Sequence, residues 1–185
     1  MTDSTKEYMQ HSFRFGSLIG FVTFIYYVIG FYLDFEKGQW FDDVYFFIEI
    51  AMIAWMMVAY KKTQIDNRVK FSRYFILGLI ASLVISLFYM IYFVVRVTKL
   101  DVLFFDNYMN EAITQLKTMG IDYSKVFTQQ NKPFFEVVFF ISIYIGNFIS
   151  NLFYVLLLSW FMSLNNRMYN MNNRNNNQNN NNNNQ

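Results

Sequence analysis

Three ionisable residues lie within or at the ends of long apolar runs, namely Glu49, Arg96 and Glu136. Charged side chains are costly inside a bilayer, so each one indicates either a function or a specific partner. We expect all three at a similar depth near the outer side, where they could hold the helices together or form a small polar pocket open to the outside. Ordinary pairing is an alternative, because Arg96 can snorkel to the headgroups and Glu136 suits a helix N-terminus. For a binding or proton-linked role, Glu49 is the strongest candidate.

Two carboxamides, Asn147 and Asn151, lie one helical turn apart in the last apolar run. In hydrocarbon such groups seek hydrogen bonds across helices. Four tyrosines of the first and third runs could supply such partners, namely Tyr26, Tyr27, Tyr89 and Tyr92.

The rest of the chain offers no catalytic set. It contains no P-loop, G-x-S-x-G or H-E-x-x-H motif, and no Cys. The single histidine, His11, precedes the first apolar run and is expected on the cytoplasmic surface. The acidic pair Asp42 and Asp43 is predicted to be a solvated loop. We therefore predict a non-enzyme with no cofactor and no metal site. The net charge of +2 does not favour nucleic acid as a partner.

Four apolar runs must position these residues, and each approaches the roughly 20 residues that cross a bilayer. No cleavage site follows the first run, so it is predicted to be a retained helix. The sequence predicts an all-α integral membrane protein, a bundle of four transmembrane helices at about Gly16–Leu33, Val44–Tyr60, Tyr74–Val95 and Phe134–Met162.

Basic residues set the expected orientation. The loop between the second and third runs holds five basic residues, Lys61, Lys62, Arg68, Lys70 and Arg73. The loop after the first run has only Lys37 among four acids. This asymmetry predicts a multi-pass protein of the inner (plasma) membrane with both termini in the cytoplasm and the acidic loop outside.

The long third loop carries apolar residues at spacings of three and four between residues 105 and 119. This spacing predicts an amphipathic helix at about residues 104–119 on the outer side, ended by Gly120. The helix could lie on the membrane, cap the bundle or bind a partner, and packing on its own bundle is the simplest expectation. Pro133 fits the first turn of the fourth helix.

Small residues mark where transmembrane helices can approach closely. Gly16 and Gly20 form a G-x-x-x-G motif in the first run. Similar stripes occur in the third run at Gly78, Ser82 and Ser86, and in the fourth at Ser142, Gly146 and Ser150. The two stripes suggest that the third and fourth helices pack together, although one stripe could instead serve a dimer or a partner.

The chain is predicted to have three parts. Residues 1–15 form a cytoplasmic segment, and residues 16–164 form the transmembrane domain. Residues 165–185 are an Asn-rich tail that cannot bury apolar area and is predicted to be disordered.

The layout also resembles a known family. Residues 69–93, VKFSRYFILGLIASLVISLFYMIYF, and residues 108–120, YMNEAITQLKTMG, resemble segments of a bacterial inner-membrane family catalogued as domain of unknown function 4199. The resemblance covers roughly residues 6–165 and implies a four-helix membrane protein. It assigns no activity to any residue.

These observations favour a non-enzymatic accessory or scaffold subunit in the cell envelope. The alternative is a small oligomeric transporter or lipid-handling protein that uses Glu49. The expected partners are membrane lipids and either another membrane protein or a second copy of the chain.

Overall fold

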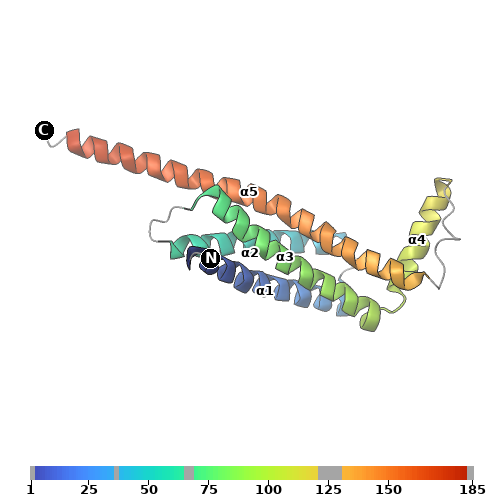
Figure 1. Ribbon diagram of the computed structural model, residues 1–185. Coiled ribbons are helices and arrows are strands. Elements are labelled where there is room, and N and C mark those ends of the chain that lie inside the picture. The colour runs from blue at the N-terminus through green and yellow to red at the C-terminus, as the bar shows by residue number, and fades with distance from the viewer. Residues whose placement is uncertain (1–2, 36–37, 65–68, 121–130, 183–185) are drawn as a thin grey trace.

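The computed structural model describes residues 3–35, 38–64, 69–120 and 131–182, and these form a helical bundle (Figure 1). Four helices are long and apolar enough to cross a membrane, as predicted, so the chain is an all-α multi-pass membrane protein. The elements in chain order are α1 (Asp3–Tyr32), α2 (Gln39–Thr63), α3 (Phe71–Val95), the π-helical turn η2 (Arg96–Leu100), α4 (Phe104–Thr118) and α5 (Lys132–Asn182).

Helix α1 begins earlier than the apolar run alone predicts. The helix starts at Asp3. Most of the segment 1–15, which was expected to precede the transmembrane domain, therefore forms the first turns of α1. Tyr8 and Phe15 of this segment pack against the apolar core, and the Ser12 hydroxyl donates to Tyr8 O at 2.8 Å. The first turns of α1 are polar and would not be predicted as part of a spanning helix. Their packing against the other helices stabilises them.

Helix α3 is the centre of the bundle. Its most extensive contacts are with α1 on one side and α5 on the other, and α2 packs mainly on α1. Two glycines allow α1 to approach α3 closely. A Cβ added at Gly16 would lie 3.0 Å from Ala81 Cα, and one added at Gly20 would lie 2.6 Å from the Phe88 ring. The G-x-x-x-G motif therefore serves a contact within the chain.

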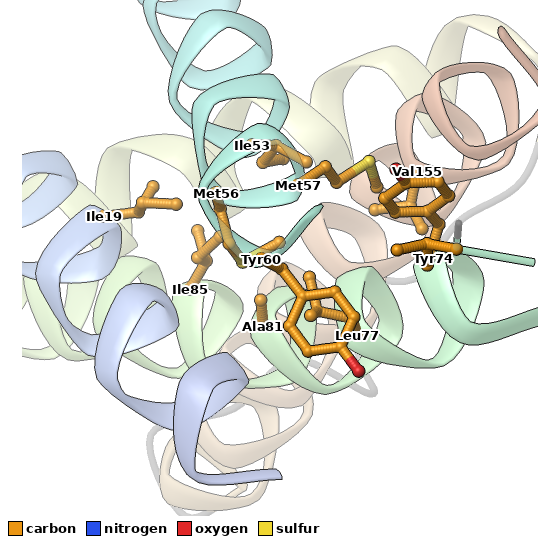
Figure 2. Close-up of a cluster of buried hydrophobic side chains, with 11 residues drawn as sticks. Ile19, Ile53, Met56, Met57, Tyr60, Tyr74, Leu77, Ala81, Ile85 and Val155 are labelled. Carbon is orange, nitrogen blue, oxygen red and sulfur yellow. The ribbon is translucent and has the colours of Figure 1, made fainter. Parts of the chain in front are cut away.

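An apolar core joins all four spanning helices in the half of the bundle that contains Tyr60 and Tyr74 (Figure 2). Its side chains are almost fully shielded from solvent, and dispersion contacts and shape matching hold such a core together in lipid. The core residues are Ile19, Ile53, Met56, Met57, Tyr60, Val69, Tyr74, Leu77, Ala81, Ile85 and Val155.

Helix α4 is the predicted amphipathic helix of the third loop, and it lies at the opposite end of the bundle from the C-terminal end of α5 (Figure 1). Gly120, at φ +81°, follows its last turn. Phe105 is 1% exposed and meets the Phe139 ring at 5.5 Å, and Lys132 Nζ lies 2.6 Å from Asp106 Oδ1. The first turns of α4 thus pack on α5 of the same chain.

Helix α5 differs from its predicted length. The sequence predicts disorder from Asn165, whereas the described backbone remains helical to Asn182 and extends past the other spanning helices (Figure 1). Each residue added to an existing helix makes one further hydrogen bond without a new nucleation cost. The preceding apolar turns supply that nucleus, and Asn disfavours a helix by less than about 1 kcal/mol per residue.

Candidate functional site

Glu49 lies near the middle of α2 and is only 4% exposed. One helical turn before it, Tyr45 projects from the same face of α2, because residues four apart are neighbours on a helix. The Glu49 carboxyl group is within hydrogen-bonding reach of the Tyr45 hydroxyl and of the Asn151 carboxamide on α5. The side chain therefore bridges α2 and α5.

Hydrogen bonds extend this bridge to the other two spanning helices. The Tyr45 hydroxyl is hydrogen-bonded to the Thr23 hydroxyl of α1. Asn151 Nδ2 donates to Asn147 Oδ1 at 3.0 Å, and Ser86 Oγ of α3 donates to the same oxygen at 2.9 Å. We call the six residues that link the four helices the polar network: Thr23, Tyr45, Glu49, Ser86, Asn147 and Asn151.

The polar network is incompletely satisfied at its centre. Glu49 Oε1 and Asn151 Oδ1 are buried and have no hydrogen-bond partner. An unsatisfied buried oxygen is costly, and a buried charge without a counter-ion costs much more. The arrangement can hold a proton or a small polar ligand between α2 and α5.

A tyrosine cluster (Tyr26, Tyr27, Tyr89 and Tyr92) separates the polar network from the Asp42 end of the bundle. The Tyr27 ring lies 5.1 Å from that of Tyr45 and 5.1 Å from that of Tyr89, measured between centroids. The Tyr27 hydroxyl donates to Asp42 Oδ1 at 3.2 Å. Polar groups thus lead from the surface at Asp42 to the neighbours of Glu49.

The sequence-predicted cluster of three charges is not assembled. The Arg96 guanidinium lies over the Phe104 ring at 4.1 Å and near Phe31 at 5.8 Å. Glu136 is half-buried in the first turns of α5. Within the described residues no ion pair joins Glu49, Arg96 and Glu136. Arg96 thus makes cation–π contact with the rings of Phe31 and Phe104.

The two carboxamides interact across helices, but with partners other than the tyrosines suggested from the sequence. Asn147 is bonded by Ser86 and Asn151 reaches Glu49. The tyrosines instead bond near the Asp42 end, where Tyr26 donates to Phe41 O at 2.8 Å. Sequence reasoning also missed Thr23 and Tyr45. The available signal was that Tyr45 precedes Glu49 by one turn.

The two small-residue stripes have different surroundings. On α3, Gly78, Ser82 and Ser86 are buried, and a Cβ added at Gly78 would lie 2.5 Å from Val155 Cγ1 of α5. On α5, the stripe at residues 142, 146 and 150 is exposed. A Cβ added at Gly146 would meet no neighbouring atom within 4 Å in the described structure. Helices α3 and α5 therefore pack together through only one of the two stripes.

His11 was predicted to be a surface residue and is instead half-buried between α1 and α2. Its ring stacks on Phe15 at 4.5 Å and meets the edge of Tyr60 at 5.4 Å, and Nε2 lies 3.3 Å from Met56 O. The prediction failed because α1 extends to Asp3, which places His11 within the helix.

An apolar hollow of about 270 Å³ lies between the ends of α1 and α2 near Asp42. The residues that line it are Tyr26, Ile29, Gly30, Phe35, Trp40, Phe41 and Val44. Its position beside the tyrosine cluster places an apolar surface next to the polar groups that lead toward Glu49.

Comparison with known families agrees with this architecture. The family model described as "Protein of unknown function (DUF4199)" matches residues 14–167, a range that includes three of the candidate spans completely and most of the first, which begins at Lys6. The chain belongs to the DUF4199 family. No curated protein and no solved structure matches it.

Proposed function

We propose that the protein is a non-enzymatic accessory or scaffold subunit of the cell envelope, which binds another integral membrane protein through the outward face of α5. One observation carries the proposal. Gly16, Gly20 and Gly78 are each in tight contact with a neighbouring helix, whereas Gly146 on α5 is open. Glycine weakens a helix by up to about 1 kcal/mol relative to alanine, so an open glycine in a spanning helix is best explained by close approach of a further helix.

The surroundings of Gly146 support this role. Ser142 and Ser150, one turn away on each side, are also exposed and donate to their own helix at Val138 O and Gly146 O. Their hydroxyls are therefore satisfied before any partner binds, and the exposed side chains nearby include the apolar Ile141, Ile145 and Ile149. Such a surface fits a transmembrane helix.

The proposed setting is the inner (plasma) membrane with both termini in the cytoplasm. The basic loop after α2 supports this orientation, as does the excess of acids between the end of α1 and the first turns of α2. Asp42 and Asp43, predicted to lie in a loop, belong to those first turns, because α2 begins at Gln39. Trp40 and Trp160 are 53% and 58% exposed near opposite ends of the bundle, as expected for interfacial anchors. The face of α5 would then be open to lipid and to other membrane proteins.

A photo-crosslinking residue at position 146, in the full chain in its native membrane, tests the proposal. The expected result is a discrete adduct with one other membrane protein, also obtained from position 150. Leu83 on α3 is 37% exposed and is the matched control position, from which the adduct should be absent. Adducts with lipid alone, or equal adducts from all three positions, would contradict the proposal. An adduct of two copies of this chain would also contradict it.

A second candidate is a small oligomeric transporter or lipid-handling protein that uses Glu49. The buried carboxyl group of Glu49 and the apolar hollow beside Phe41 favour this candidate. The hollow could bind an acyl chain, while the polar network could bind a polar group of the same ligand. Glu49→Gln should then abolish a substrate- or proton-dependent signal while the protein still inserts. An unchanged signal would count against this candidate.

A further inference from the structure

Glu49 is the only buried acidic side chain within the described part of the membrane domain. No cation pairs with it there, and its Oε1 atom has no hydrogen-bond partner. An ionised carboxylate at this position would lack both water and a counter-ion. The energetic cost of that state favours the neutral acid.

The hydrogen bonds around Glu49 are compatible with the neutral acid. Thr23 Oγ1 donates to Ile19 O at 2.9 Å and is also hydrogen-bonded to the Tyr45 hydroxyl, where either oxygen can be the donor. When Thr23 donates to Ile19 O, Tyr45 donates to Thr23, and a protonated Glu49 can then donate to Tyr45.

The surroundings of Glu49 differ between the Asp42 end and the Tyr60 end of the bundle. Toward Asp42, hydroxyl groups form a series, because Tyr27 donates to Asp42 and is also hydrogen-bonded to Tyr89. Toward Tyr60, the apolar core closes the bundle (Figure 2). On that side Ser82 donates to its own helix at Gly78 O, and the buried Ser159 hydroxyl has no hydrogen-bond partner among the described residues. Rotation of hydroxyl groups can move a proton along the first route, whereas the hydrogen bonds of Glu49 within the described structure are with Tyr45 and Asn151 and with no hydroxyl of the apolar core.

Titratable and charged groups face Glu49 or its hydroxyl neighbours from every helix packed around it. Tyr45 is on its own helix, with Asp42 at the end of that helix. The others are Tyr27 on α1, Tyr89 on α3, Arg96 on η2 and Tyr154 on α5. Arg96 interacts with Tyr89, so it lies beside the route to Asp42.

We propose that Glu49 is a one-sided proton-binding site, which holds its proton at neutral pH and exchanges it through the tyrosine cluster with the compartment at the Asp42 end. Release of the proton leaves a charge between α2 and α5 and removes the bond donated to Tyr45. The contact between these helices therefore depends on the bound proton. The site does not require the membrane protein that we propose binds the outward face of α5. Because it opens to one side only, it is not a path for transport across the membrane.

Infrared spectroscopy of the full protein in lipid vesicles, with ¹³C-labelled glutamate, tests the protonation state. The expected result at pH 7 is a carbonyl band of a protonated glutamic acid that disappears in Glu49→Gln. In Glu49→Asp the band should reappear with labelled aspartate, which covers the case that the Gln variant does not fold. Absence of a protonated glutamate at pH 7, or a band that survives Glu49→Gln, would overturn the proposal.

The rate of proton loss after a jump to alkaline pH tests the route. Tyr27→Phe and Tyr45→Phe should slow the loss of the Glu49 band on the order of 10- to 100-fold, since each removes a positioned hydroxyl. Tyr60→Phe is the matched control at the other end of α2 and should leave the rate unchanged. Slowing by Tyr60→Phe, or an unaltered rate in both other variants, would contradict the one-sided route. None of these outcomes bears on crosslinking at position 146, so the two proposals fail separately.

Discussion

The two small-residue stripes have similar sequences and opposite surroundings. Gly78 on α3 lies against Val155 of α5, whereas Gly146 on α5 faces away from the bundle. The face of α5 that meets α3 instead presents Asn147, Asn151 and Val155. In lipid, burial of apolar area does not favour one face of a helix over another. Packing is therefore decided by shape and by hydrogen bonds, and here the carboxamides of α5 outweigh its small residues.

The largest effect is expected from a large side chain at the packed glycine. Gly78→Leu would force its side chain into Val155, where even a Cβ lies 2.5 Å from Cγ1. Overpacking of this kind costs about 1–3 kcal/mol, and the separation of α3 from α5 would also weaken the polar network. Unfolding in detergent mixtures, followed by loss of helical circular dichroism, measures the free-energy change. A stability equal to that of the original protein would show that the α3–α5 contact is not as close as described.

A smaller effect is expected from two matched serine substitutions. Ser86 donates to Asn147 on another helix, whereas Ser150 donates to Gly146 O of its own helix. Ser86→Ala should cost about 0.6 kcal/mol, the mean for hydrogen bonds between membrane helices. Ser150→Ala should cost less, because the bond it loses does not join two helices. The same unfolding measurement compares them, and an equal or larger cost for Ser150→Ala would contradict the assignment of the two faces.

No loss of stability is expected at the open glycine. Gly146→Leu places its side chain where a Cβ has no neighbour within 4 Å and removes a residue that weakens the helix, so the free energy of unfolding should rise by up to about 1 kcal/mol. The same variant should abolish the protein adduct formed from position 150, because its side chain fills the open space at Gly146 that a partner helix would approach. A loss of stability as large as that of Gly78→Leu would show that the Gly146 face of α5 packs against another helix of the bundle. If the adduct from position 150 still forms, Gly146 is not part of the surface that binds the partner.

The spanning helices could be predicted because hydrophobicity over about 20 residues is a local property of the chain. The amphipathic helix α4 was predicted for a similar reason, since its apolar spacing and Gly120 lie within one short segment. The extension of α1 to Asp3 was missed, because it depends on packing by Tyr8 and Phe15 against residues far away in the sequence.

Within the candidate site, Glu49 could be selected from the sequence because a carboxyl group in an apolar run is costly wherever it points. Its partners could not be selected in the same way. Depth along the membrane suggested Arg96 and Glu136, but rotation of each helix about its axis decides which side chains meet. That rotation directs Asn151 toward Glu49 and leaves Arg96 against Phe104.

By itself, then, the sequence determined that this chain is a four-span helical membrane protein with a carboxyl group, Glu49, inside an apolar run and no recognised catalytic motif. Length and hydrophobicity are sufficient for those conclusions. Only the tertiary structure decided that six polar side chains from four helices form one network, and that one small-residue stripe is packed while the other is open. Both depend on how the helices are rotated and paired, and that outcome reflects the sum of many weak contacts between distant residues.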